Sequence, residues 1–470
     1  MNSYKKLLGN SFVFAIGRLG SKLISFFLVP VYTYYLSTAE FGTVDLVITT
    51  VSMLLPIVSA SIFDAVLRFI MDDKNETDSV MMNALYIAII GFLIALLFYP
   101  LIIWLNLLDD STFVMFMYII LFMQMLERIF AEYARAIGEI KKFAINGILI
   151  TISTGTLNIL FLVVFGLGVN GYFVSMILAY LISIIYLVLS TKAYRHFDLS
   201  LIKKPVMKLL LFYSVPLIPN TLMWWLINAS SRYFIRFFIG IGANGLFAVA
   251  SRIPSLIKIF IQIFMQAWQL SAIEEFDSEN KSDFYSNVFN YLSSLLFIGI
   301  AAILIVLKPG ISFLFAADYY EAWVVVPFLL LGAVFSSFSS FLGTNYIAAK
   351  KTKGVFKTSV YGGLVSLVLN YILISQFGII GAGISSMLSF FIIWILRVYD
   401  TREYIDMTIN WKLLIQNLVI ISLHIALLFF DVPVYYEIMA GIGLFLLILF
   451  VNRSLWLLLK KIWKNVKRKK

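Results

Sequence analysis

The sequence predicts an all-α polytopic membrane protein with about 14 transmembrane helices. Of its 470 residues, 61% are hydrophobic and 13% are charged, and the mean hydropathy is +0.96. Apolar runs repeatedly exceed the ~20 residues that a helix needs to cross a bilayer. The runs are continuous and do not alternate, so we expect helices that satisfy their own backbone and not the strands of a closed barrel.

Fourteen spans follow one another along the chain, each an apolar run bounded by charged or turn-forming residues. The twelfth and fourteenth are short and are expected to extend by a turn or two. The spans are predicted at 10–36, 41–70, 80–105, 112–135, 144–165, 171–191, 209–239, 245–272, 285–307, 323–349, 358–377, 383–396, 413–430 and 434–451.

The distribution of Lys and Arg predicts the orientation of these spans. With the N-terminus inside, the cytoplasmic segments hold 26 of the 36 basic residues, and the outer loops hold only Lys308. Because basic residues are retained on the cytoplasmic side, both termini are predicted to be cytoplasmic. The net charge of +11 then reflects topology and does not indicate nucleic-acid binding. The basic C-terminal tail is expected to lie on anionic lipid head groups.

Two halves of the chain repeat each other. LNILFLVVFG at 157–166 and LNYILISQFG at 369–378 lie 212 residues apart, and Gly42 and Gly245 occupy similar positions near the starts of spans two and eight. Six spans per copy is an even number, so the repeat is parallel. We predict six-helix bundles at 1–203 and 204–404, followed at 405–470 by spans thirteen and fourteen and the tail. Asn158 and Asn370 are expected to form hydrogen bonds between helices within each bundle.

Ionisable side chains inside the spans are costly in lipid and therefore indicate functional positions. All four acids lie in the first half. Asp64 with Arg68, and Arg128 with Glu132, have the spacing of pairs along one helix. In spans seven to twelve the bases have no acid within the same six spans, so we expect them to face water, the other bundle or an anionic ligand. The acids, candidates for ion coupling, are Asp45, Asp64, Glu127 and Glu132.

Polar residues line one face of several spans. At about 100° per residue, the polar residues of span eight from 252 to 269 share one face of the helix. Such faces also occur as helix–helix seams joined by amides, but cations without counter-charges fit a seam poorly. We therefore predict a cationic cavity, lined by Arg18, Lys22, Arg232, Arg236, Arg252 and Lys258, with Gln262, Gln266, Asn228 and Trp224 as its polar and aromatic residues.

The order of these features resembles the polysaccharide-transporter branch of the multidrug/oligosaccharidyl-lipid/polysaccharide exporter superfamily, the Wzx-type flippases. The similar stretches are GNSFVFAIGRLGSKLISFFLVPVYTYYLSTAEFGTVDL, YSVPLIPN, SRYFIRFFIGIGANGLFAVASRIPSL and the two LN…FG segments. The resemblance implies two bundles around a central cavity and movement of polyprenyl-diphosphate-linked oligosaccharides to the outer leaflet by alternating access. In this family an Asp often precedes the Arg of span seven, where this chain has Ser231.

Several classes are excluded or disfavoured by what the sequence lacks. It contains no Cys and only two His, and it shows no phosphate-binding loop, dinucleotide fingerprint or HExxH motif, so no metal, cofactor or enzymatic activity is expected. A multidrug exporter of the same fold, a membrane glycan polymerase or ligase and a non-catalytic assembly partner remain alternatives. The expected partners are a lipid-linked glycan, membrane lipids and a polymerase or ligase. A monomer in the bacterial cytoplasmic membrane is expected.

Overall fold

The fold is described from a computed structural model, which describes residues 20, 22, 24–72, 77–105, 108, 110–351, 353–453 and 455. No strand occurs within these residues. Twelve of their helices are long and apolar enough to cross a membrane, and a shorter apolar helix covers Ile24–Tyr35. The prediction of an all-helical membrane protein is thus confirmed, whereas the count of fourteen and the placement of both termini stay predictions.

The chain divides into two compact units, which are described separately below. The first comprises 1–236 and 240–248, and the second comprises 237–239 and 249–470. The first unit therefore includes most of the expected seventh span. The boundaries at 203 and 404 are those of the sequence repeats, and they stay a prediction.

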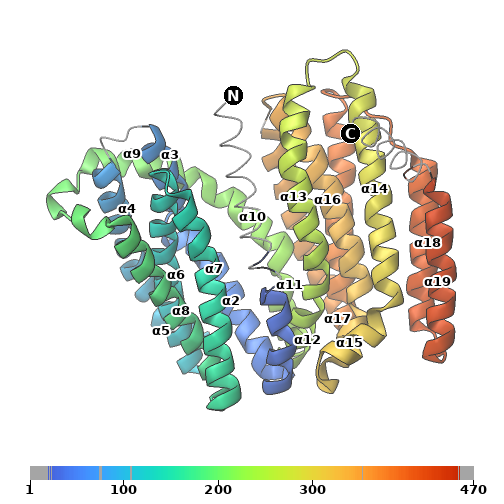
Figure 1. Ribbon diagram of the computed structural model, residues 1–470, viewed down its shortest axis with the longest axis horizontal. Coiled ribbons are helices and arrows are strands. Elements are labelled where there is room, and N and C mark those ends of the chain that lie inside the picture. Colours follow the sequence, from blue (N-terminus) through green and yellow to red (C-terminus); the bar gives the residue numbers. More distant parts are fainter. Residues whose placement is uncertain are drawn as a thin grey trace, which may run out of the picture. The chain divides into compact units, whose positions relative to one another are not determined.

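The first unit is built around α6, which packs against α2, α3 and α8, while α7 packs on α8 (Figure 1). Asp110 caps α6 by accepting a hydrogen bond from the backbone N–H of Thr112, and this bond lowers the pKa of the Asp110 carboxyl. The helices of this unit are α2 (Thr38–Val58), α3 (Ile62–Asp72), α4 (Thr77–Leu96), α5 (Tyr99–Trp104), α6 (Ser111–Ala136), α7 (Ile140–Asn158), η2 (Ile159–Val164), α8 (Gly168–Thr191), η3 (Ala193–His196), η4 (Leu199–Leu201), α9 (Lys204–Ser214), η5 (Val215–Leu217), α10 (Ile218–Ala229) and most of α11 (Ser231–Phe238) and α12 (Ile241–Ala250).

In the second unit α16 packs against α13, α14 and α17, and α18 and α19 lie side by side against α14. These last two helices are red in Figure 1. Lys308 on α15 forms a buried ion pair with Glu437 on α19, 2.7 Å between Nζ and Oε2, which holds the C-terminal helix pair to the unit. The helices are α13 (Arg252–Glu274), α14 (Lys281–Ile305), α15 (Leu307–Leu314), η6 (Ala317–Val324), α16 (Val326–Ala348), α17 (Lys353–Thr401), α18 (Trp411–Phe429) and α19 (Val434–Val451).

Four of the predicted spans are interrupted, and span three divides into α4 and α5 just before Pro100. Span two divides into α2 and α3 after Pro56, where Ala60 and Ser61 both have a positive φ. Span seven divides into α9, α10 and α11, with one 3₁₀ turn at Pro216 and with Pro219 in the first turn of α10. Span eight divides into α12 and α13 at Ser251, three residues before Pro254. In each case proline removes a backbone donor and crowds the preceding turn, so the helix stops or bends nearby.

The two LN…FG motifs both end in a glycine with a positive φ. Gly166 has a φ of +63° and Gly378 a φ of +60°, a region that L-residues other than Gly rarely adopt. The first glycine separates η2 from α8, and the second kinks α17, so that α17 covers both predicted spans eleven and twelve. The repeated Gly thus turns the chain at equivalent points in the two copies. The expected extension of span twelve is confirmed, because α17 continues to Thr401.

Candidate functional site

An ion pair in the first unit joins α2 to α11. The Nε of Arg232 donates to Oδ2 of Asp45 at 2.5 Å, and the two side chains are 14% and 8% exposed. Arg232 also donates to the backbone oxygen of Asn228 and lies over the ring of Phe247. Sequence analysis expected this cation to face water, the other bundle or an anionic ligand. The structure pairs it with a carboxylate of the first sequence repeat. A pair this buried is costly to break, because the remaining charge loses its partner.

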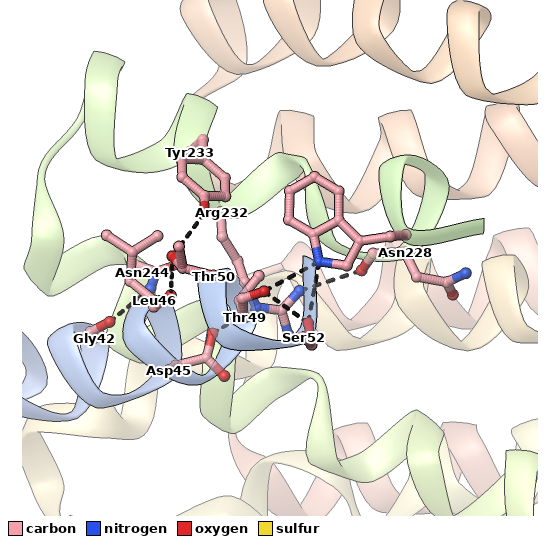
Figure 2. Close-up of polar contacts among 11 residues, drawn as sticks. Gly42, Asp45, Leu46, Thr49, Thr50, Ser52, Asn228, Arg232, Tyr233 and Asn244 are labelled. Carbon is pink, nitrogen blue, oxygen red and sulfur yellow. Dashed lines mark hydrogen bonds and ion pairs between the residues drawn. The ribbon is translucent and has the colours of Figure 1, made fainter. Parts of the chain in front are cut away.

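Neutral hydrogen bonds lie near this ion pair along α2 (Figure 2). The indole Nε1 of Trp225 donates to the backbone oxygen of Thr49 and to Oγ of Ser52, both at 3.1 Å. The hydroxyls of Thr50 and Tyr233 lie 2.7 Å apart. Sequence analysis selected Trp224 as the aromatic residue, but the described hydrogen bonds to α2 come from its neighbour. Polar residues of α2 at a spacing of three to four residues were the signal that could have indicated this cluster.

Near the start of α2, this helix crosses α12 at Gly42 and Gly245, the two glycines that the sequence repeat aligned. A Cβ on Gly42 would lie 2.1 Å from the backbone oxygen of Ile241, and a Cβ on Gly245 would lie 1.9 Å from that of Thr38. Each glycine thus meets the carbonyl four residues before the other glycine. Asn244 donates from Nδ2 to the backbone oxygen of Gly42 at 2.8 Å. The reciprocal contact requires glycine at both positions, since a side chain would separate the backbones.

In the second unit, α13 carries the polar face predicted for span eight. Arg252 and Lys258 are half-buried, and Gln262 and Gln266 are exposed. Lys258 lies 6.0 Å from the ring centroid of Phe390. The Nε of Arg252 is buried and has no hydrogen-bond partner among the described residues. A buried cationic donor without a partner is unfavourable in an apolar surrounding, so this nitrogen is suited to an acceptor from a ligand or water.

The acids of the first unit differ in their partners. Glu132 pairs with Arg135 and not with Arg128, which lies over the ring of Phe63. Arg68 pairs with Asp72 and not with Asp64, whose side chain is exposed. The two pairings expected from spacing alone are therefore wrong. Both observed pairs also follow a spacing of three or four residues, so the choice of partner depended on side-chain direction.

Glu127 forms no ion pair with any residue that the structure describes. It lies half-buried on α6, where its Oε1 accepts a 2.7 Å hydrogen bond from Nδ2 of Asn146 on α7. Oδ1 of Asn146 in turn accepts a 2.6 Å bond from Ser183 on α8. The hydroxyl of Ser183 thereby orients the amide of Asn146 so that its NH₂ group points toward the carboxyl of Glu127. Three helices thus fix the position of this carboxyl group.

The remaining predicted site residues are distributed over both units. Arg18 lies outside the described residues. Lys22 and Asn228 are exposed, and Trp224 and Arg236 are half-buried. The first unit contains Lys22, Trp224, Asn228, Arg232 and Arg236, whereas Arg252, Lys258, Gln262 and Gln266 belong to the second.

One charged residue just beyond the predicted end of span twelve is fully buried. Arg397 on α17 is 1% exposed. Its guanidinium donates to Thr358 Oγ1, Ser359 Oγ and the backbone oxygens of Ser339 and Val355. The four neutral acceptors connect α16 to the first half of α17. An Arg at the predicted end of an apolar run gives no sequence signal that separates a buried position from a cytoplasmic one.

Comparison with known proteins identifies the family. Residues 7–269 match the family described as "Polysaccharide biosynthesis protein". The chain belongs to this family. An uncharacterized membrane protein of Methanocaldococcus jannaschii is 31% identical over 119 residues, which cover 25% of this chain and 23% of that relative. The capsular polysaccharide biosynthesis protein CapF of Staphylococcus aureus is 23% identical over 189 residues, or 40% of this chain and 48% of CapF. The matches thus span less than half the length of these relatives.

Solved structures with the same fold come from two groups of transporters. The lipid II flippase MurJ in an inward closed conformation aligns with a TM-score of 0.69 and 16% identity, over 94% of this chain and 99% of MurJ. An inward-facing multidrug resistance MATE family transporter of the MOP superfamily aligns with a TM-score of 0.67 and 14% identity, over 83% of this chain and 98% of that one. The resemblance found in the sequence is thereby confirmed, and this family member is a multi-pass membrane protein with a flippase and exporter fold.

Proposed function

We propose that this protein is a flippase that moves a polyprenyl-diphosphate-linked oligosaccharide, or a similar anionic glycolipid precursor, from the inner to the outer leaflet by alternating access. The observation that carries this proposal is the polar face of α13. There the Nε of Arg252 is buried without a partner among the described residues, on a helix long and apolar enough to span a membrane. Diphosphate oxygens are strong acceptors for a guanidinium and would satisfy this nitrogen.

Arg252 and Lys258 are proposed to bind the anionic head group, with Gln262 and Gln266 offering hydrogen bonds to its sugars. The two bases lie six residues apart, so their Cα atoms are separated by about 9 Å along the helix. A charged group with several acceptor oxygens can be passed between such positions by charge-assisted hydrogen bonds. A cationic drug would be repelled by the same face, which favours an anionic substrate over the multidrug alternative.

The basic residues Arg18, Lys22, Arg232 and Arg236 are proposed as further binding positions. For Arg232 the proposal includes the release of its ion pair with Asp45, because an arginine in a close pair has fewer donors for a ligand. Protonation of Asp45 would release it, and Glu127 is proposed as the second coupling carboxyl, since it lacks a described cation partner. Asp64 and Glu132 are weaker candidates, the first because it is exposed and the second because it is paired.

The direct test replaces Arg252 by Ala and measures both surface glycan and the lipid-linked precursor that accumulates in the inner leaflet. Loss of one charge-assisted contact should weaken binding by about 1.5–3 kcal/mol, or roughly tenfold to more than a hundredfold. Arg68→Ala is the matched control, since Arg68 is exposed and paired with Asp72. Normal export by Arg252→Ala at normal protein level would contradict the proposal, as would polymer extension in membrane extracts, which would indicate a polymerase.

A further inference from the structure

A pocket of about 490 Å³ lies in the second unit where α17 ends and α18 begins. Its lining comes from the last turns of α17, the segment 402–410 that joins the two helices, Trp411 at the start of α18, and Leu342 on α16. Because α17 and α18 are both long and apolar enough to cross a membrane, the segment between them lies at the level of the lipid head groups. The pocket is therefore placed where acyl chains give way to polar head groups.

The lining of this pocket changes from apolar to charged along α17. Four of its residues have the spacing of a single helix face, namely Ile395, Val398, Tyr399 and Arg402. The first two are aliphatic, and Tyr399 is 75% exposed, as aromatic side chains at the membrane interface often are. From Ile395 to Thr401 at the end of the helix, this change takes place over about 9 Å. Such a gradient fits an amphipathic molecule that lies along the helix with its polar end at the loop.

The charged end of the pocket consists of Arg402 and Asp406. The Nε of Arg402 donates to Oδ1 of Asp406 at 3.1 Å, and the two side chains are 72% and 70% exposed. An exposed pair of this kind contributes little stability by itself. The two NH₂ groups of the guanidinium and the second carboxylate oxygen have no partner among the described residues. The pair thus offers donors to an anionic group and an acceptor to a cationic one.

The loop that carries this pair is fixed on α14. The backbone N–H of Thr408 donates to Oγ of Ser286 at 2.8 Å, and Nδ2 of Asn290 donates to the backbone oxygen of Thr408 at 3.3 Å. Oδ1 of Asn290 accepts from the backbone N–H of Asn410 at 3.1 Å. The wall of the pocket is therefore formed before a ligand arrives, and binding does not have to order the loop.

We propose that this pocket binds a zwitterionic phospholipid whose head group carries a primary ammonium, as in phosphatidylethanolamine. The phosphate accepts hydrogen bonds from the free NH₂ groups of Arg402, and the ammonium donates to the free oxygen of Asp406. Each of the four charges then has a neighbour of opposite sign within the protein or the lipid. The first carbons of the acyl chains lie against Ile395 and Val398. The bound molecule is a lipid of the surrounding membrane, so the inference does not depend on the proposed flippase function.

Charge complementarity distinguishes this ligand from the other lipids of a membrane. Phosphatidylglycerol supplies the phosphate but no cation, so Asp406 would face negative charge. Phosphatidylcholine has the cation, but its methylated nitrogen has no N–H to donate to a carboxylate. A polyisoprenyl diphosphate places two anionic groups beside Asp406 and lacks an ammonium. Phosphatidylethanolamine alone among these four matches both charges of the pocket.

The experiment uses the full-length protein in nanodiscs of phosphatidylcholine that contain a phosphatidylethanolamine with a diazirine on an acyl carbon close to the glycerol. Labelled peptides are mapped by mass spectrometry. We expect labelling within residues 395–411. Unlabelled phosphatidylethanolamine should suppress it at a mole fraction about fivefold or more below that needed of phosphatidylglycerol with the same chains. Free phosphoethanolamine, which has the head group without the chains, should not suppress it.

Two variants separate the roles of the charges. Asp406→Asn keeps the size of the side chain but removes its charge, so the preference for phosphatidylethanolamine over phosphatidylglycerol should fall about fivefold or more. Arg402→Gln should weaken competition by both lipids. Asp72→Asn is the matched control, because Asp72 pairs with Arg68 at the same spacing and the same 3.1 Å but does not line the pocket. Melting temperatures of all variants show that the protein is folded.

Several results would overturn the inference. Equal suppression by phosphatidylglycerol, or labelling spread evenly over the membrane-spanning helices, would show that no head group is selected. An Asp406→Asn protein that keeps the native preference, or an Asp72→Asn protein that loses it equally, would remove Asp406 from the site. Suppression by free phosphoethanolamine would indicate a water-soluble ligand. Suppression by a polyisoprenyl diphosphate at a lower mole fraction than phosphatidylethanolamine would assign the pocket to the exported lipid.

Discussion

Each unit holds one charged side chain among three helical segments, bound in each case by a residue that the repeat aligns. Asn146 binds Glu127 in the first unit, and Thr358 binds Arg397 in the second. Asn146 and Thr358 are 212 residues apart in the sequence, as are the two LN…FG motifs. In the first unit the charge is a half-buried acid with one described amide donor. In the second it is a fully buried base with four described acceptors.

This difference distinguishes a charged group whose nitrogens are all hydrogen-bonded within the fold from one that has a single described hydrogen bond. The guanidinium of Arg397 is surrounded by acceptors on every nitrogen and is almost completely withdrawn from solvent, so a ligand would have to displace existing bonds. The carboxyl of Glu127 keeps an oxygen without a described partner and remains partly accessible. The repeat thus aligns Asn146 with Thr358, while the charge that each of them binds comes from a different helix of the repeat, Glu127 from α6 and Arg397 from the end of α17.

The largest loss of stability is expected for Arg397→Met. The substitution keeps the unbranched chain but removes the hydrogen bonds from the guanidinium that connect α16 to α17, and a hydrogen bond from a charged group contributes ~1.5–3 kcal/mol. We expect a loss of at least ~3 kcal/mol in the free energy of unfolding, which thermal unfolding in detergent would detect. Arg402→Met is the control, because Arg402 is 72% exposed in its pair with Asp406. Equal melting temperatures for the two variants would show that the buried bonds contribute little.

The next largest loss of stability is expected at Gly42 and Gly245, which contact each other in the first unit. Alanine at either position would require the backbones of α2 and α12 to move apart, because the added Cβ would lie within 2.1 Å of a carbonyl oxygen. We expect each variant to lose ~1–3 kcal/mol of stability, the usual cost of overpacking. Gly147→Ala, where a Cβ meets no atom within 4 Å, should be neutral or slightly stabilising. A neutral Gly42→Ala variant would contradict the close crossing.

Much of the fold followed from hydropathy and the repeat, because each of these reports a property of whole segments, while the orientation from the positive-inside rule stays a prediction. Breaks such as that at Ser251 and the kink at Gly378 were less visible, since proline and glycine also occur inside continuous membrane helices. At the site, spacing along one helix predicted partners for Arg68 and Arg128 incorrectly. The pairs Asp45–Arg232 and Arg397–Thr358 join residues far apart in sequence, and spacing along one helix contains no information about such contacts.

A smaller effect is expected for the two Asn residues of the repeated motif. Asn158 donates to the hydroxyl of Tyr32 on another helix at 2.9 Å, which confirms the expected interhelical bond. Asn370 donates to Ser366 on its own helix at 3.4 Å. Asn158→Leu should therefore lose ~0.6–1.7 kcal/mol, the range for such bonds in membranes, and Asn370→Leu is expected to fall in the same range. Thermal unfolding measures both, and unchanged melting temperatures would show that these amides do not stabilise the fold.

The smallest change in stability is expected for Glu127→Gln, together with a clear change in function. Glutamine preserves the size of the side chain and its carbonyl accepts the same hydrogen bond from Asn146, so the melting temperature should stay close to that of the native protein. If Glu127 carries the coupling proton, export should lose its dependence on external pH, with a loss of coupling of about fivefold to a hundredfold. Glu132→Gln is the matched control on the same helix, because Glu132 already pairs with Arg135.

Export by these two variants would be followed in vesicles across an imposed pH gradient. A Glu127→Gln protein that keeps the native pH response would remove this carboxyl from the coupling step. Substitution of Asn146 by Leu sharpens the distinction, because it deletes the amide donor and leaves the carboxyl in place. If the amide stabilises the charged form of Glu127, the pH response of Asn146→Leu should shift to higher pH, since loss of a donor to a carboxylate favours its protonated form. A merely structural contact would lower stability without moving that response.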